Sequence, residues 1–379
     1  MRKIQMVDLQ KQYQEIKQEV DSSIQEVINN CTFINGPTVK QFQANLEKYL
    51  EVKHVIPCGN GTDSLQVALM ALDLQPGDEV ITTTFTFIAT AEVIALLKLT
   101  PVLVDVYPDT FNIDMDAVEK AITDKTKAVI PVHLFGQCVD MERLMNLAKK
   151  HNLYIIEDAC QAIGADYHFS NGEIKKAGTI GTIGCTSFFP SKNLGCYGDG
   201  GAAFTNDDDL AKKLRGIVNH GMFVRYYHDI VGVNSRLDSI QAAVLDVKLK
   251  HLDAYNQRRN EAAAFYNQTF ANHENIITPV LGKQTTHVFH QYTLILKNID
   301  RAKVVAYMQE KEIPVMIYYP VPMHLQKAYQ DPRYKTGDFP VSEYLSQHVI
   351  SLPMHTELDP EQLNYITSNF LKAIELAKK

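Results

Sequence analysis

The chain of 379 residues contains no uninterrupted apolar run long enough to span a bilayer, which argues against an integral membrane protein. Its N-terminus, MRKIQMVDLQKQYQEIKQEV, has basic residues but no apolar stretch behind them. This segment therefore lacks the pattern of a signal peptide and is typical of an amphipathic helix. Internal repeats and low-complexity tracts are also absent. We expect a cytoplasmic protein with no membrane partner.

The six cysteines are scattered and form no CxxC pair, so neither a disulfide framework nor a metal site of the zinc type is indicated. A net charge of -7 argues against generic nucleic-acid binding, although a local basic pocket could still hold an anionic ligand. The GxGxxG and GxxxxGK[ST] patterns are both missing, which disfavours a Rossmann or P-loop nucleotide site. Any phosphate must be bound by other local groups.

What is present predicts an α/β protein. The length allows one large domain and one smaller one, and a 45% hydrophobic content with 21% charged residues is ordinary for a globular protein. Short β-branched runs alternate with helical patterns, which indicates a sheet covered on both faces. The runs are DEVITTTFTF, TPVLVDV, KAVIPVHLFG, NLYIIEDA, GCTSFFP and GGAAFT. Helices are expected at TDSLQVALMALDL and DMERLMNLAKKHN, where apolar residues recur on one face.

From about residue 235 the sequence predicts a long connecting helix that leads into a smaller α+β domain. In that domain, strands are expected at HQYTLILKN and IPVMIYYPVP around a helix at RAKVVAYMQEKE. We place the boundary near residue 250, which gives a large domain over 1–250 and a small C-terminal domain over 251–379. It stays open whether the first ~15 residues pack on the small domain.

One lysine lies in an unusual setting. The stretch CTSFFPSKNLGCYGDGGAAFT places Lys192 between aromatic residues and a glycine-rich run, where backbone can approach a ligand closely. An isolated lysine at such a turn usually extends into solvent. The alternative is a Schiff-base lysine whose amine becomes nucleophilic when burial or a neighbouring charge lowers its pKa.

Two further stretches give this alternative support. NLYIIEDACQA puts Asp158 at the carboxyl end of a strand, where it could cap a helix, bind a metal or hold the ring nitrogen of pyridoxal phosphate protonated. CGNGTDSLQ runs from Gly61 and Thr62 into a helix whose free amides suit a phosphate, although any N-cap after a glycine turn looks similar. Neither Lys192, nor Asp158, nor the turn at Gly61 and Thr62 identifies a cofactor alone. Together, and in this order along the chain, they fit one cofactor, pyridoxal 5'-phosphate.

With these residues in place, the sequence resembles the pyridoxal-phosphate-dependent nucleotide-sugar aminotransferases of the DegT type. The resemblance covers essentially the whole chain and rests on GNGTDSL, TTTFTFIAT, PVHLFGQ, IEDACQAIGA, TSFFPSKNLGCYGDGGA, GVNSRLDSIQAA and YYPVPMHLQ. It implies an aspartate-aminotransferase-like fold (type I), with a large domain on a mixed, mostly parallel sheet. It also implies a homodimer with each active site at the subunit interface.

The resemblance implies a role for each matching residue. Lys192 would form the internal aldimine and shuttle protons, while Asp158 would pair with the pyridine nitrogen. Gln161 would face the ring oxygen, and Phe87 would stack on the ring, although a phenylalanine here could also be a core residue. The residues expected at the phosphate are Gly61, Thr62, Ser187 and, from the partner subunit, Asn234. Those expected at the sugar nucleotide are Arg236, His324 and Arg225, each of which could instead be a solvated or salt-bridged side chain.

The motif FFPSKNLGCYGDGGA, preceded by GCTS, is similar to that of one branch of the family. Enzymes of this branch make UDP-2-acetamido-3-amino-2,3-dideoxyglucuronate from the 3-oxo sugar, with L-glutamate as the amino donor. A role in the synthesis of lipopolysaccharide or another surface glycan follows at the level of the family. Aminotransferases for dTDP- or UDP-linked 6-deoxy sugars share most motifs and remain an alternative. So do a cofactor-dependent dehydratase and a non-catalytic regulatory protein. Asn60 and Cys160 depart from the common family forms.

Overall fold

The computed structural model describes residues 1–379 and is built around a seven-stranded sheet in the order β1-β9-β8-β5-β4-β2-β3. The strands are β1 (His54–Cys58), β2 (Glu79–Thr83), β3 (Thr100–Val104), β4 (Thr126–Ile130), β5 (Tyr154–Asp158), β8 (Ile183–Ser187) and β9 (Gly201–Thr205). Only β9 runs antiparallel to its neighbours. The predicted α/β fold with a mixed, mostly parallel sheet is confirmed, and each predicted run of this region contains a strand.

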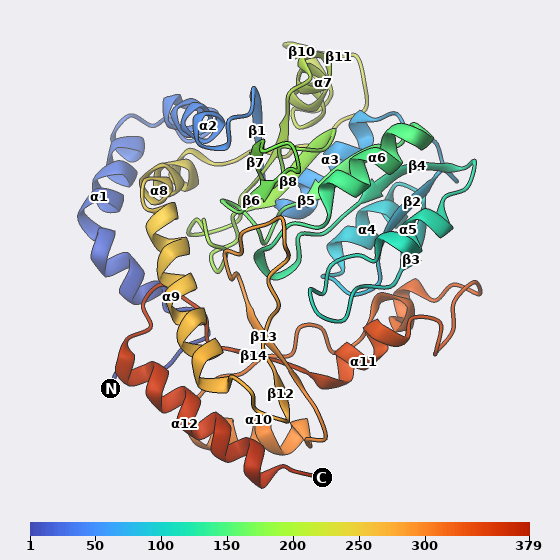
Figure 1. Ribbon diagram of the computed structural model, residues 1–379. Helices are drawn as coiled ribbons and strands as arrows, with labels where there is room; N and C mark the ends of the chain where they lie inside the picture. Colours follow the sequence, from blue (N-terminus) through green and yellow to red (C-terminus); the bar gives the residue numbers. More distant parts are fainter.

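Helices cover both faces of this sheet (Figure 1). One face carries α3 (Gly61–Ala71), α4 (Ala89–Leu96) and α7 (Asp208–Ile217); the other carries α2 (Pro37–Leu50), α5 (Met115–Ala121), α6 (Met141–His151) and α8 (Ser239–Leu249). Successive strand side chains point to opposite faces, so Ile155 packs against α6 while Ile156 enters the core beneath α3. The N-terminal helix α1 (Leu9–Asn29) packs on α8.

The C-terminal part forms a separate core. It contains a three-stranded antiparallel sheet of β12 (Ile276–Ile277), β13 (Tyr292–Leu296) and β14 (Val349–Leu352). Its helices are α9 (Leu252–Phe270), α10 (Arg301–Glu310), α11 (Pro340–His348) and α12 (Pro360–Leu376). Ile4 is buried in this core, and the N-terminus lies beside α12, with the Met1 amine 3.3 Å from Glu361 (Figure 1). The division of the chain at residue 250 stays a prediction.

Two predicted elements of this region differ in the structure. The long connecting helix is interrupted at Lys250 and His251, between α8 and α9. The stretch 313–322 forms no strand, and only Met316 bridges to Ser351. Its prolines cannot donate backbone hydrogen bonds to a ladder, and β14 takes the expected place beside β13. The sequence also failed to predict β1 and the small hairpins β6–β7 (Asp166–His168, Ile174–Lys176) and β10–β11 (Met222–Val224, Tyr227–His228).

The direction of the strands positions the site. Because β1, β2, β5 and β8 are parallel in direction, the segments that follow them meet at one edge of the sheet. These segments begin at Gly59, Thr84, Ala159 and Phe188, and together with the last residues of β5 and β8 they carry most of the residues that the sequence singles out. None of the helices combines the length and the apolar character needed to cross a membrane.

Adjacent acids at the end of β5 have different roles. Glu157 is fully buried and points away from this edge, whereas Asp158 faces it. The oxygens of Glu157 accept hydrogen bonds from the amides of Gly178, Ile180 and Gly181 and from Nε2 of His133. Glu157 therefore holds the loop before β8 in place.

We expect Glu157→Gln to lower the free energy of unfolding by about 2–4 kcal/mol, because an amide cannot accept at both ends and leaves a buried N–H unpaired. Urea unfolding measures the change. Glu173→Gln is the matched control, since that exposed carboxylate contacts only Lys175, at 3.3 Å, among charged groups. Equal unfolding midpoints for the two variants would contradict the assignment.

Candidate active site

A pocket of ≈ 760 Å³ opens at this edge, between the large-domain loops and the C-terminal part. A volume of this size suits a cofactor together with a small substrate. The predicted residues that line it are Gly61, Thr62, Phe87, Asp158, Gln161, Ser187 and Lys192. Segments that lie far apart in the chain thus contribute to one site.

The amine of Lys192 is free inside this pocket. No hydrogen bond or ion pair joins it to another side chain. Part of the residue is open to the pocket, but burial of its amine lowers the pKa of Lys192, against the opposing influence of Cys160 and Asp158. An amine in this state loses its proton at a lower pH than a surface lysine does, and it is then a nucleophile and a base.

Asp158 provides a fixed negative charge in the same pocket. Its carboxylate is 6% exposed and accepts hydrogen bonds from Oγ1 of Thr90 at 2.9 Å and from the amide of Cys160 at 3.2 Å. No salt bridge joins Asp158 to Lys192. The carboxylate is therefore oriented by neutral donors and remains available to a cationic group of a ligand.

The start of α3 forms a cradle for an anion. Oδ1 of Asn60 accepts from the amide of Asp63 at 2.8 Å, while the amides of Gly61 and Thr62 have no hydrogen-bond partner. A side chain at position 61 would place its Cβ 2.6 Å from Cβ of Ser187, so only glycine permits this close approach. Free amides, a helix N-terminus and two nearby hydroxyls together suit a phosphate.

Phe87 and Gln161 both line the pocket. Phe87 is 56% exposed and lines the pocket, which rules out the alternative of a core phenylalanine, while Phe85 is the buried one. Oε1 of Gln161 accepts from the amide of Phe135 at 2.9 Å, and its Nε2 donates to the Tyr319 hydroxyl at 3.2 Å. Both side chains adjoin Tyr319 of the C-terminal part, whose ring centre lies 6.4 Å from that of Phe87.

Several lining residues escaped the sequence analysis. The C-terminal part contributes a wall of His290, Gln291, Tyr318 and Tyr319, the loop after β2 contributes Thr86, and the start of α4 contributes Thr90. Burial, reinforced by the charges of Lys192 and Arg259, holds the pKa of His290 well below its usual value, so the imidazole is neutral. Both Nδ1 of His290 and Oγ1 of Thr86 are buried without a partner, which points to a ligand as their partner.

The remaining predicted residues lie outside this pocket. His324 is buried, with its ring nitrogens 2.9 Å from Oγ1 of Thr84 and 3.0 Å from Glu343. Arg225 lies on the exposed β10–β11 hairpin, 4.9 Å from the centre of the Tyr226 ring. Asn234 is exposed and bridges to Asn219 through its backbone. The roles of His324 and Arg225 toward a substrate, and of Asn234 toward the cofactor phosphate of a partner subunit, stay predictions.

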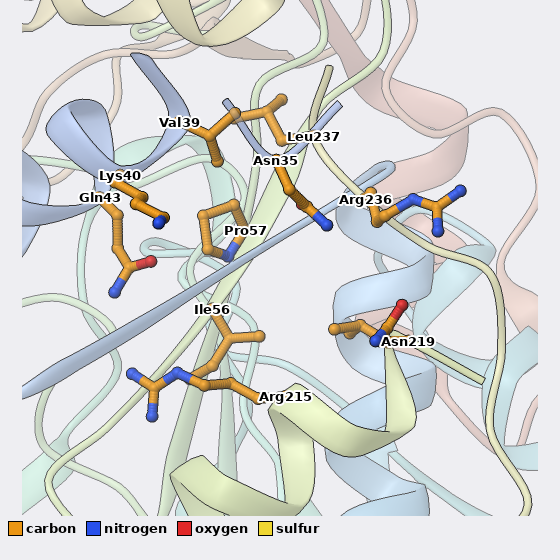
Figure 2. Close-up of a pocket in the computed structure, with 11 residues that line it drawn as sticks. Asn35, Val39, Lys40, Gln43, Ile56, Pro57, Arg215, Asn219, Arg236 and Leu237 are labelled. Atoms are coloured by element: carbon orange, nitrogen blue, oxygen red, sulfur yellow. The ribbon is translucent and has the colours of Figure 1, made fainter. Parts of the chain in front are cut away.

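Arg236 lines a second, smaller pocket of ≈ 230 Å³. Figure 2 shows it there with Arg215 and Lys40, around a floor that includes Ile56 and Pro57. No carboxylate lines this second pocket, so it is a basic patch in an acidic protein. Within one chain, Arg236 does not reach the pocket of Lys192.

The comparisons with known proteins agree with this geometry. The profile of the DegT/DnrJ/EryC1/StrS aminotransferase family matches residues 14–371. The chain belongs to this family. It is 47% identical to the pleiotropic regulatory protein of Geobacillus stearothermophilus over 96% of each chain. It is 43% identical to the UDP-2-acetamido-2-deoxy-3-oxo-D-glucuronate aminotransferase of Pseudomonas aeruginosa, over 96% of this chain and 98% of the relative.

Solved structures lead to the same family. The X-ray structure of S. venezuelae DesV in complex with a ketimine intermediate superposes with a TM-score of 0.94, at 38% identity over 99% of each chain. The aspartate-aminotransferase-like fold that the resemblance implied is thereby confirmed. The protein is a sugar aminotransferase that depends on pyridoxal 5'-phosphate.

The residues of the large pocket fit that cofactor. An anion cradle lies at the start of α3, an unpaired lysine amine lies in the pocket, and an exposed aromatic face stands at its rim. Asp158 provides the carboxylate that a protonated ring nitrogen requires. The unpartnered Oγ1 of Thr86 is a further polar group that a bound cofactor could satisfy.

Proposed function

We propose that the enzyme transfers the amino group of L-glutamate to the C3 keto group of UDP-2-acetamido-2-deoxy-3-oxo-glucuronate, with Lys192 as the catalytic lysine. The observation that carries the assignment of Lys192 is its unpaired, buried amine in a pocket that also holds Asp158 and a phosphate cradle. The substrate rests on the 43% identity with the Pseudomonas aeruginosa enzyme. The proposal includes a cytoplasmic location and a role in making lipopolysaccharide or another surface glycan.

Each residue of the pocket has a task in this reaction. Bound pyridoxal phosphate withdraws electrons from the carbon that carries the transferred amino group. Lys192 takes the proton from the α-carbon of the donor and later delivers a proton to the sugar carbon. Asp158 keeps the ring nitrogen protonated, Phe87 packs on the ring, and Gln161 fixes its oxygen. Transfer in two halves, with glutamate released as 2-oxoglutarate before the sugar reacts, gives ping-pong kinetics.

The charge of the pocket bears on how the substrates bind. Lys192 is its only cationic side chain, whereas glutamate and the UDP-linked glucuronate bring several negative charges. Cations from outside the pocket must therefore contribute. We propose a homodimer in which Asn234 of one subunit reaches the phosphate of the other site. Arg236, from the basic pocket of Figure 2, would meet the glucuronate carboxylate across the same interface.

The substrate proposal predicts selectivity for the carboxylate. Wild-type enzyme should turn over the 3-oxo-glucuronate at least ~30-fold better in kcat/KM than the same UDP sugar without the carboxylate, since a buried bidentate ion pair contributes about 2 kcal/mol or more. Arg236→Ala should remove most of this preference. Arg215→Ala, which changes another arginine of the same pocket, should retain it. Sugar product and 2-oxoglutarate are measured together.

Equal turnover of the two sugars by wild type would contradict the glucuronate assignment, because the enzyme would then not recognise the carboxylate. Consumption of the ketosugar without formation of 2-oxoglutarate would favour a dehydratase. The 47% identity with a pleiotropic regulatory protein supports a second candidate, an added regulatory role. A regulator that acts through catalysis loses its effect in Lys192→Ala, whereas one that acts by binding alone retains it.

A further inference from the structure

A buried polar seam joins the lysine loop to the C-terminal part of the chain. Asn193, the residue after Lys192, donates from Nδ2 to Oδ1 of Asn256 at 2.7 Å and to the carbonyl of Val288 at 2.8 Å. Asn256 belongs to α9, and Val288 belongs to the segment that leads into β13. One amide thus connects the residue after Lys192 to α9 and to the segment that carries His290.

The seam extends to the other walls of the pocket. Nδ2 of Asn256 donates to the carbonyl of Ile163 at 3.3 Å, in the turn that follows Gln161. One helical turn along α9, Nη1 of Arg259 donates to the carbonyls of Phe289, at 3.1 Å, and Met354, at 3.0 Å. These bonds fix the backbone beside His290. The bonds of Asn193 and Asn256 and those of Arg259 therefore meet at the consecutive residues Val288 and Phe289, next to His290.

Burial of this polar seam costs folding free energy. Asn193 is 5% exposed, and its Oδ1 has no hydrogen-bond partner. An unpaired buried acceptor costs about 1–3 kcal/mol, which offsets what its two donated bonds contribute. The net contribution of Asn193 to stability is therefore small, and its main effect is to set direction and distance between the segments that it joins.

We propose that Asn193 is a positioning residue for Lys192: through Asn256 and Val288, it holds the lysine loop in register with the wall of His290, Gln291 and Tyr319. This inference rests on the assignment of Lys192 under the proposed function. Proton transfer between a lysine amine and a substrate carbon depends steeply on distance, and a misplacement of ~1 Å can lower a rate by about 100-fold. Asn193 affects the rate without touching the reacting atoms.

The test compares Asn193→Ala, Asn256→Ala and the double variant in holoenzyme form. The readouts are the single-turnover rate with L-glutamate, the rate at which added pyridoxal phosphate attaches to apoprotein, and the unfolding temperature. Asn275→Ala is the matched control, because this amide is 8% exposed, donates to the carbonyl of Lys297 at 2.9 Å and also has an unpartnered Oδ1. It lies outside the residues that line the pocket.

We expect each single variant of the seam to lower both rates about tenfold or more. The loss in the double variant should be smaller than the product of the two single losses, because either single variant already removes the bond that the two residues share. Asn275→Ala should lose similar thermal stability while its rates stay within about threefold of wild type. Asn256→Asp retains the oxygen that accepts from Asn193, so both of its rates should exceed those of Asn256→Ala. This comparison also serves if the alanine variants fold poorly.

Rates of Asn193→Ala that equal those of Asn275→Ala would overturn the positioning role, as would fully additive losses in the double variant. The failure of the proposed function has a different signature. If wild-type protein forms no cofactor band that depends on Lys192, the lysine assignment and this inference fall together. If the band forms and glutamate does not alter it, the attachment rates of the variants still decide the role of Asn193.

Discussion

Replacing Lys192 by alanine is expected to abolish transamination, with a loss of more than about 10³-fold in turnover, because the variant lacks both the nucleophile and the proton carrier. The purified variant should also lack the visible absorption band that borohydride fixes in wild type. Adding L-glutamate should convert the wild-type band and leave the spectrum of the variant unchanged.

The charge of Lys192 and its nucleophilicity are separable. Lys192→Arg keeps a cation in the pocket, but a guanidinium holds its proton at any working pH and cannot attach to the cofactor. We expect this variant to be as inactive as Lys192→Ala. Turnover in Lys192→Arg, or a borohydride-fixed band in either variant, would show that a different lysine attaches the cofactor.

The lowered pKa of Lys192 has a consequence for stability. Between its lowered pKa and the ordinary value of about 10.4, the folded protein without cofactor binds fewer protons at this site than the unfolded chain does. This site therefore destabilises the fold at neutral pH, and the effect fades as the pH rises toward that ordinary value. Lys192→Met should unfold at a higher temperature than wild type at pH 7, and the difference should shrink at pH 10.

Sequence reasoning succeeded where local pattern and strand direction coincide. The apolar run that ends in Glu157 and Asp158 predicts a buried strand, and parallel strands carry their following residues to one edge. It singled out Asp158 but gave no role to Glu157, which strand alternation turns to the opposite side. Only the partners of Glu157 reveal that it holds the loop before β8.

The sequence pattern gave a wrong prediction where the backbone is irregular. The run of residues 313–322 resembles a strand, yet its prolines break the ladder, and Tyr318 and Tyr319 line the pocket instead. His290 and Gln291 precede β13 by two positions and one position, and nothing in their sequence shows that α9 and Asn193 fix this segment. Such contacts join residues roughly 100 positions apart, which no local period encodes.

Asp158→Asn is expected to lower turnover by about 100- to 1000-fold while cofactor remains bound, because a preorganised charge is removed without a change in shape. The amide oxygen can still accept from the amide of Cys160, and Thr90 can reverse its hydroxyl to accept from the new NH₂ group. The phosphate cradle and Lys192 are unchanged, so the absorption band should form in the variant. Its conversion by L-glutamate, followed by stopped-flow absorbance, gives the rate.

Two matched variants separate the charge of Asp158 from its surroundings. Thr90→Val removes the hydrogen bond at 2.9 Å but keeps the carboxylate, so its loss should stay within about tenfold. Asp199→Asn removes an exposed carboxylate that lines the same pocket, and it should leave the glutamate half-reaction nearly unchanged. If Asp158→Asn converts as fast as Asp199→Asn, Asp158 does not hold the ring nitrogen. A loss confined to Asp158→Asn assigns the electrostatic role to that one carboxylate, at the end of β5.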